Sequence, residues 1–155
     1  MPEPSADNDY LSHHVQMLRS SLRALTGRDL VDGDRSPAEA ARLVYRAPFA
    51  VLSHGTEADP LLNYANRCAL DLFELDWETM VGMPSRLTAE APEREERFRL
   101  LARVAAQGYI DDYSGVRVSR TGRRFVIEAA TVWNLEDVSG QCGGQAAVFA
   151  LWRPI

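Results

Sequence analysis

The stretch LLNYANRCALDLFE, residues 61–74, decides the fold, because the spacing of its apolar residues changes at Asn66. Its first five residues read as the second strand of a hairpin whose first strand is PFAVLS at 48–53. After Asn66 the apolar residues take helical spacing. Asparagine suits this junction, since its side-chain oxygen can accept hydrogen bonds from the free backbone N–H groups of a helix start. We therefore predict a strand that runs directly into a helix, with Asn66 as its structural N-cap.

The sequence on either side of this stretch adds four helical segments and three strands. The helical segments are residues 9–26, 36–47, 76–82, where Asp76 can cap, and 92–108. The strands are residues 109–119, 123–135 and 144–152. Helices grouped between two sets of strands indicate an α+β fold. We expect a five-stranded antiparallel sheet with a helical cover on one face and an N-terminal helical extension.

The composition is that of an ordinary soluble globular protein, with 46% hydrophobic and 25% charged residues among 155. A net charge of −5 argues against a nucleic-acid surface, which requires positive charge along one face. No apolar run approaches the roughly 20 residues of a membrane-spanning helix. The first ten residues contain no basic or apolar export signal. We therefore expect a cytoplasmic location, without nucleic-acid or membrane partners and without a metal site.

Several short motifs resemble those of PAS domains. They are Tyr64-Ala65-Asn66, Leu72-Phe73, Gly82-Met83-Pro84 and Arg120-Thr121-Gly122. Over 48–154 the chain more closely resembles the MEKHLA domain, a PAS-like module found alone in bacteria and at the C-terminus of some plant homeodomain–leucine-zipper proteins. The likeness is carried by SHGTEADPLLNYANRCALDLFELDW, GMPSR, GYIDDYSGVRVSRTGRRFVIEAATVWNL and GQAAVFALW. It implies a PAS-like MEKHLA domain of the stand-alone bacterial type at 48–155, preceded by a two-helix extension at 1–47.

The resemblance to PAS domains raises the question of a chromophore, and the residues disfavour both common ones. Flavin photosensors of this fold need a reactive cysteine in the helix after the GMPSR stretch, and Cys68 stands before it. PAS haem pockets take a histidine from the central helical segment, whereas His13, His14 and His54 all precede that segment. We expect no required cofactor, and an unidentified small-molecule ligand instead.

The last hairpin allows the faces of its strands to be predicted. With Thr121 and Gly122 as a two-residue loop, Val118 pairs with Phe125 and the pairing continues to Ile110 opposite Trp133. On this register Asp112, Ser114, Thr131 and Trp133 line the inner face, while Arg117 and Glu128 form a structural salt bridge on the other. Aromatic walls around such polar groups suit a small amphipathic ligand. The predicted ligand-binding residues are His54, Trp77, Ser85, Arg86, Asp112, Ser114, Thr131, Trp133 and Trp152. The alternative is that the tryptophans fill the core and the polar groups satisfy one another.

Two helices carry predictions of their own. The first has an apolar seam with spacings of 4, 3, 4 and 3, namely Leu11, Val15, Leu18, Leu22 and Leu25. This seam can cover the outer face of the sheet or pair with a second copy, and we expect it to do both, in a homodimer or with a protein partner. In the helix at 92–108, Glu93 stands four residues before Arg97 and Glu95 four before Arg99, which predicts ion pairs on a solvated face.

Three functions follow in order of preference. The first is a PAS-like sensory or regulatory module that binds a small molecule and signals through dimer or partner contacts. The second is a pure interaction module with a filled pocket. The third is an enzyme on a conical α+β fold with Asp112 or His54 as base; since no acid–base pair is evident, we expect no catalysis.

Overall fold

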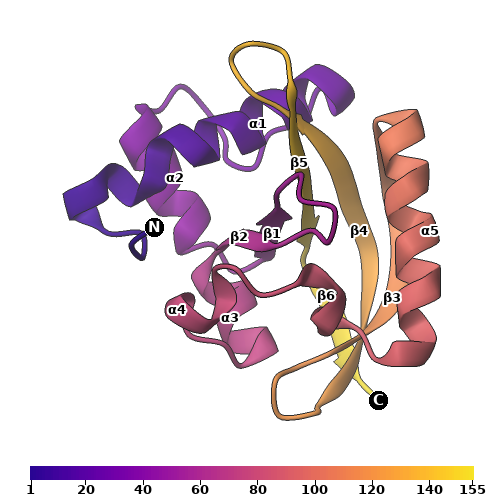
Figure 1. The fold of residues 1–155 in the computed structure, drawn as a ribbon. Coiled ribbons are helices and arrows are strands. Elements are labelled where there is room, and N and C mark those ends of the chain that lie inside the picture. Colours follow the sequence, from indigo (N-terminus) through magenta and orange to yellow (C-terminus); the bar gives the residue numbers. More distant parts are fainter.

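A computed structural model describes residues 1–155, except for the side chains of residues 91 and 92. Its helical elements are η1 (Ala6–Leu11), α1 (Ser12–Thr26), α2 (Pro37–Tyr45), α3 (Arg67–Phe73), α4 (Trp77–Met80), η2 (Ser85–Thr88) and α5 (Ala91–Gln107). Its strands are β1 (Ala50–His54), β2 (Leu62–Ala65), β3 (Tyr109–Val118), β4 (Arg124–Glu136), β5 (Cys142–Phe149) and β6 (Leu151–Pro154). The predicted α+β order is confirmed, and α1 and α5 lie on opposite sides of the β4–β5 strands (Figure 1).

The sheet is antiparallel, with strand order β2-β1-β5-β4-β3, and β6 also pairs with β4. It has six strands rather than the predicted five because the last strand is interrupted. Val148 pairs with Thr131 and Leu151 with Glu128, so β5 and β6 follow β4 in one register. The interruption lies opposite Ala129, whose φ of 52° is left-handed and breaks the ladder on β4.

Asn66 is the N-cap of α3, as predicted, and its side chain also bonds to three further segments at the centre of this fold. Its Oδ1 accepts from Ala69 N at 3.1 Å at the start of α3, and also from Val51 N at 3.0 Å in β1. Its Nδ2 donates to Val44 O at 3.0 Å and to Phe49 O at 2.8 Å. The side chain is completely buried. One residue therefore ties the end of α2 and the start of β1 to the β2–α3 junction.

The β3–β4 hairpin departs from the predicted register by one residue. Arg117, not Val118, is opposite Phe125. The reason is the loop: Ser119 N donates to Arg123 O at 2.9 Å, which leaves three loop residues, the last in the left-handed conformation, instead of two. A slip of one residue exchanges the two faces of a strand. Arg117 therefore points toward the helical cover, on the face opposite to the predicted one.

The predicted Arg117–Glu128 salt bridge is consequently wrong. Glu128 pairs instead with Arg153 of β6 at 2.8 Å on the exposed face. The left-handed conformation of Ala129 also exchanges the two faces of β4 at that point of the strand. Residues before Ala129 face the helical cover at odd positions, and residues after it do so at even positions. Trp133 therefore lies on the α1 side of the sheet, where its Nε1 donates to Leu18 O at 3.2 Å.

Helix α1 packs on the sheet within its own chain. Of the predicted seam, Val15, Leu18 and Leu22 are buried, whereas Leu11 is partly buried and Leu25 is exposed at the C-terminal end. The prediction of cover for the outer sheet face is thus confirmed for the middle of the seam. Pairing of the seam with a second copy stays a prediction.

His14 lies on the side of α1 that packs against Tyr64, and the burial of its ring makes the free energy of unfolding depend on pH. His14 stacks on Tyr64 with ring centroids 5.5 Å apart, and its Nε2 donates to Ser53 Oγ at 2.9 Å, because the Ser53 hydroxyl itself donates to Asn63. Burial, and secondarily the charge of His13, lowers the pKa of His14 to about 4. The folded protein therefore holds this ring neutral at pH values where the unfolded chain protonates it.

We expect the free energy of unfolding to fall by about 2 kcal/mol between pH 8 and pH 5, measured by urea denaturation. The unfolded chain binds the extra proton as the pH drops below its ordinary pKa of about 6.5, so stability is lost toward acid. Burial lowers the pKa of His54 as well, and adds to the loss in the same direction. The variant His14→Gln should remove most of this pH dependence, and exposed His13→Gln should retain it. An unchanged pH dependence in His14→Gln would contradict the assignment.

Candidate functional site

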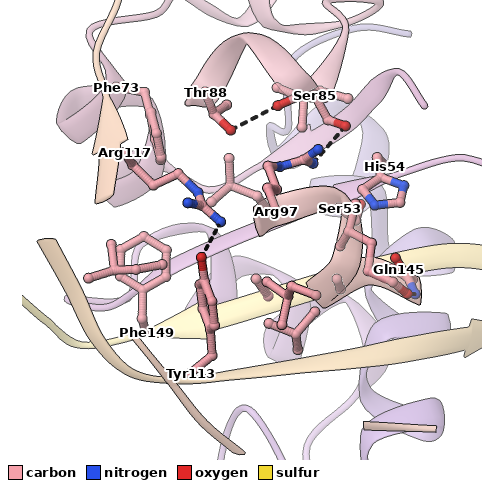
Figure 2. A pocket seen from close by; sticks show the side chains of 18 residues that line it. Ser53, His54, Phe73, Ser85, Thr88, Arg97, Tyr113, Arg117, Gln145 and Phe149 are labelled. Atoms are coloured by element: carbon pink, nitrogen blue, oxygen red, sulfur yellow. Dashed lines mark hydrogen bonds between the residues drawn. The ribbon is translucent and has the colours of Figure 1, made fainter. Parts of the chain in front are cut away.

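A cavity of about 80 Å³ lies between the inner face of the sheet and the helices α5 and η2 (Figure 2). Its walls are mainly aliphatic and aromatic side chains from β1, β4, β5 and α5. The polar side chains on its lining include His54, Ser85, Arg97, Tyr113 and Arg117. Such a space, apolar with a few convergent polar groups, is the usual form of a small-molecule site.

Arg97 reaches the cavity from α5. Its Nη2 donates to Ser85 Oγ at 2.8 Å, which connects α5 to η2. The predicted Glu93–Arg97 ion pair does not form, whereas the predicted Glu95–Arg99 pair does, at 3.1 Å. Burial, and secondarily the positive charge of Arg117, lowers the pKa of Arg97 to about 10. Arg97 remains charged at neutral pH, in surroundings that disfavour the charge.

Arg117 reaches the same cavity from β3 and is only 6% exposed. Its Nη2 donates to the hydroxyl of Tyr113 at 2.9 Å and its Nη1 to the carbonyl of Val116 at 2.7 Å. Gly115 allows this arrangement, because a Cβ atom there would overlap the Tyr113 hydroxyl oxygen. The sequence Tyr-Ser-Gly-Val-Arg thus places a tyrosine against a glycine so that it meets the arginine two residues further on.

His54 is the last residue of β1 and lines the cavity, and its exposed fraction is 9%. Its Nδ1 donates to Gly55 O at 3.0 Å, since a carbonyl can only accept. Nε2 is therefore the unprotonated nitrogen, and it has no hydrogen-bond partner in the described part of the chain. Burial lowers the pKa of His54, so the ring is neutral at physiological pH. A buried acceptor without a donor is costly unless a ligand or water supplies one.

The structure brings only two of the nine predicted ligand-binding residues, His54 and Ser85, to this cavity. Trp133 and Thr131 face α1 and its following loop, where Arg28 Nη2 approaches Thr131 Oγ1 at 3.5 Å. Trp77 is buried against Tyr64 and donates to Met1 O at 2.9 Å.

The other four predicted residues lie at the surface or at the edge of the sheet. Asp112 and Ser114 are exposed on β3. Arg86 is exposed and pairs with Asp59 at 3.2 Å. Trp152 stacks edge-on against Phe149 at 5.9 Å, outside the cavity. The one-residue difference in register explains why Asp112 and Ser114 face solvent and Arg117 faces the cavity, since such a slip exchanges the two faces of β3.

A model of the MEKHLA domain family matches residues 12–154. The chain belongs to the MEKHLA domain family. The match confirms the resemblance seen in the sequence, and it begins early enough to include helices α1 and α2. In the described part of this MEKHLA domain, no helix has the length and hydropathy needed to cross a membrane. The same residues contain no cluster of three or more metal-ligating side chains.

Two plant proteins illustrate its relatives. The domain is 28% identical over 144 residues to the homeobox-leucine zipper protein ATHB-14 of Arabidopsis thaliana, covering 89% of this chain and 17% of that protein. It is 27% identical over 128 residues to ATHB-9 of the same plant, covering 79% and 15% respectively. The chain thus spans less than a fifth of the length of these curated relatives.

Solved structures confirm the PAS-like fold. The PAS domain of a protein from Colwellia psychrerythraea matches with a TM-score of 0.61 at 16% identity, covering 76% of this chain and 94% of that one. An RNA-binding light-oxygen-voltage receptor matches with a TM-score of 0.59 at 16% identity, covering 77% and 36%. At such identities the likeness concerns the fold alone.

Proposed function

We propose that this MEKHLA domain is a sensory or regulatory module that binds a small molecule between its sheet and helices. Its signal passes through contacts with a second copy or another protein. The observation that carries the proposal is the cavity with polar groups left in need of a partner: the Nε2 atom of buried His54, the charge of buried Arg117 and the charge of half-buried Arg97. A PAS-like fold with a MEKHLA family match supports a sensory role.

The size and lining of the cavity favour a ligand smaller than the common PAS chromophores. Pockets for drug-sized ligands typically enclose about 300–1,000 Å³, against about 80 Å³ here. The cavity lining includes no cysteine, and Cys68 lies at a different surface groove. These features support neither a flavin nor a haem as the ligand.

Binding rather than catalysis is also supported by the placement of the two candidate bases. Asp112 is exposed outside the cavity, and the hydrogen-bond partner of His54 is a backbone carbonyl. A general base must lie within hydrogen-bond reach of the proton that it removes, and in the described part of the chain no donor reaches the free Nε2 atom of His54. We therefore propose no reaction for this site.

A protein-interaction module without a ligand is the second candidate. It is favoured by the small cavity and by Phe98, which is 74% exposed on the outer side of α5. Phe98 offers an apolar contact on the helix that also carries Arg97, but single exposed apolar side chains are common on protein surfaces, so the small cavity is the stronger of the two observations. In the first candidate this same surface transmits the signal, because α5 forms part of the cavity wall.

Native mass spectrometry of the freshly purified protein, compared with the denatured spectrum, distinguishes the two candidates. We expect an additional mass that is present only in the native spectrum. Native spectra without any additional mass, together with a melting temperature unchanged by a panel of small metabolites, would leave the interaction module as the function. The same spectra report whether the protein is a monomer or a dimer.

A further inference from the structure

Two guanidinium groups face one small cavity without a carboxylate partner. Arg97 enters it from α5 and Arg117 from β3 (Figure 2). Among the described side chains, no Asp or Glu oxygen lies within the 4.0 Å of an ion pair with either group. Asp59 attracts Arg97 from beyond ion-pair distance, but it forms its own ion pair with Arg86 at 3.2 Å. Arg117 is buried and Arg97 is half-buried, and charges withdrawn from water are normally paired, so this cavity has an unmet need for negative charge.

The neutral groups beside the arginines do not meet that need. Tyr113 and Ser85 each accept a hydrogen bond from an arginine, Tyr113 from Arg117 at 2.9 Å and Ser85 from Arg97 at 2.8 Å. A hydroxyl that accepts still has its own hydrogen to donate. The polar part of the cavity is thus rich in hydrogen-bond donors, which is the composition that recognises an anion.

The rest of the cavity limits the kind of anion. Its walls include Leu62, Leu100, Ile127, Val132 and Phe149, none of which can hydrogen-bond. A tetrahedral oxyanion would have to leave oxygen atoms unsatisfied against such walls, at a considerable cost. A molecule with one carboxylate and a short apolar tail satisfies both parts. A volume of about 80 Å³ leaves room for a tail of only a few atoms.

We infer that the cavity binds a short aliphatic carboxylate whose oxygens accept hydrogen bonds from Arg97 and Arg117 and whose tail contacts the aliphatic walls. This inference rests on the proposed function, which requires that the cavity be a ligand site. Such a ligand joins α5 to β3, because each arginine belongs to a different element. A hydroxyl on the tail can also donate to the free Nε2 of His54.

The test measures the melting temperature of the full chain at low chloride against rising concentrations of acetate, propionate, butyrate and lactate. Propionamide, which has the shape of propionate without its charge, and inorganic phosphate are the comparison probes. We expect at least one carboxylate to raise the melting temperature in a saturable manner, because a ligand that binds only the folded state stabilises it. Propionamide and phosphate should leave the melting temperature unchanged.

Variants then separate binding from folding. Arg97→Met and Arg117→Met should each weaken the affinity for the carboxylate at least about tenfold, since each removes a charged hydrogen-bond donor. Arg97→Met should also raise the melting temperature of the ligand-free protein by about 2–4 °C, because it removes an uncompensated charge. A purely structural Arg97 would lower it. Arg99→Met is the control on the same helix, and affinity there should be unchanged, since Arg99 is exposed and pairs with Glu95.

The outcomes separate this inference from the function on which it rests. A neutral molecule retained in the native mass spectrum, or stabilisation by propionamide, keeps the sensory function and overturns the carboxylate. Stabilisation by phosphate alone does the same. No retained molecule and no stabilisation by any of the four carboxylates overturns both. Stabilisation that persists undiminished in both Arg97→Met and Arg117→Met places the carboxylate elsewhere, and overturns the assigned site.

Discussion

Replacing Asn66 with alanine is expected to lower the free energy of unfolding by about 4 kcal/mol. The side chain is fully buried and makes four hydrogen bonds, at 2.8 to 3.1 Å, to the backbone of α2, β1, α3 and the segment between α2 and β1. Alanine removes all four and leaves the N–H groups of Val51 and Ala69 and the carbonyl of Phe49 without this partner, whereas the carbonyl of Val44 still accepts from Ala47 N at 3.3 Å. Each buried group left unsatisfied costs about 1–3 kcal/mol, and water can satisfy few of them at a site with no exposure. Urea denaturation at neutral pH measures the loss.

Asp76→Ala is the matched control for Asn66→Ala. Asp76 also caps a helix, but its side chain is exposed and accepts from the single N–H group of Thr79 at 2.7 Å. Loss of an ordinary N-cap costs about 1 kcal/mol. Equal losses in the two variants would mean that Asn66 acts only as the cap of α3, and that its bonds to Val44, Phe49 and Val51 add nothing.

The contrast between Asn66 and Arg117 shows which parts of this fold could be predicted from sequence. The role of Asn66 depends on residues next to it in the chain, and the switch from strand to helix spacing is visible there. The direction of Arg117 depends on a three-residue loop, and that of Trp133 on the left-handed conformation of Ala129. An alanine gives no sign that it adopts such a conformation, since glycine and asparagine are the residues that usually do. The sequence therefore predicts where the strands lie, but not which of their side chains point to each side of the sheet.

The site was less predictable than the fold for the same reason. His54 and Ser85 were found because each follows a recognisable element end, whereas Arg97 has helical neighbours that equally fit an intrahelical ion pair. Arg97 turns to Ser85 instead of Glu93, and only the position of η2 above α5 decides between them. Tyr113 does carry a local signal that the sequence analysis missed. It is the glycine two residues later, where a strand position without a side chain marks the close approach of another group.

Leu18→Ala is expected to lower the free energy of unfolding by about 3 kcal/mol, the second largest effect predicted here. Leu18 is completely buried in the middle of α1, and its backbone carbonyl accepts from the indole of Trp133 on β4. Truncation to alanine leaves a cavity between the helix and the sheet, and a cavity adds its own cost to the lost apolar burial. Leu25→Ala, at an exposed position of the same seam, should cost less than about 1 kcal/mol. Chemical denaturation of both variants against the wild type gives the comparison.

The dependence of these losses on protein concentration decides what the seam of α1 does. Because Leu18 is buried within its own chain, the loss of stability in Leu18→Ala relative to the wild type should be the same at low and high protein concentration. If the seam is buried between two copies, folding and association are coupled, and the midpoint rises with concentration. A large loss in Leu18→Ala that is independent of concentration would confine any dimer contact to the exposed residues of α1, such as Leu25, or to other surfaces. A loss that appears only at low concentration would instead make the seam the dimer interface, and the packing of α1 on β4 would then be the minor contribution.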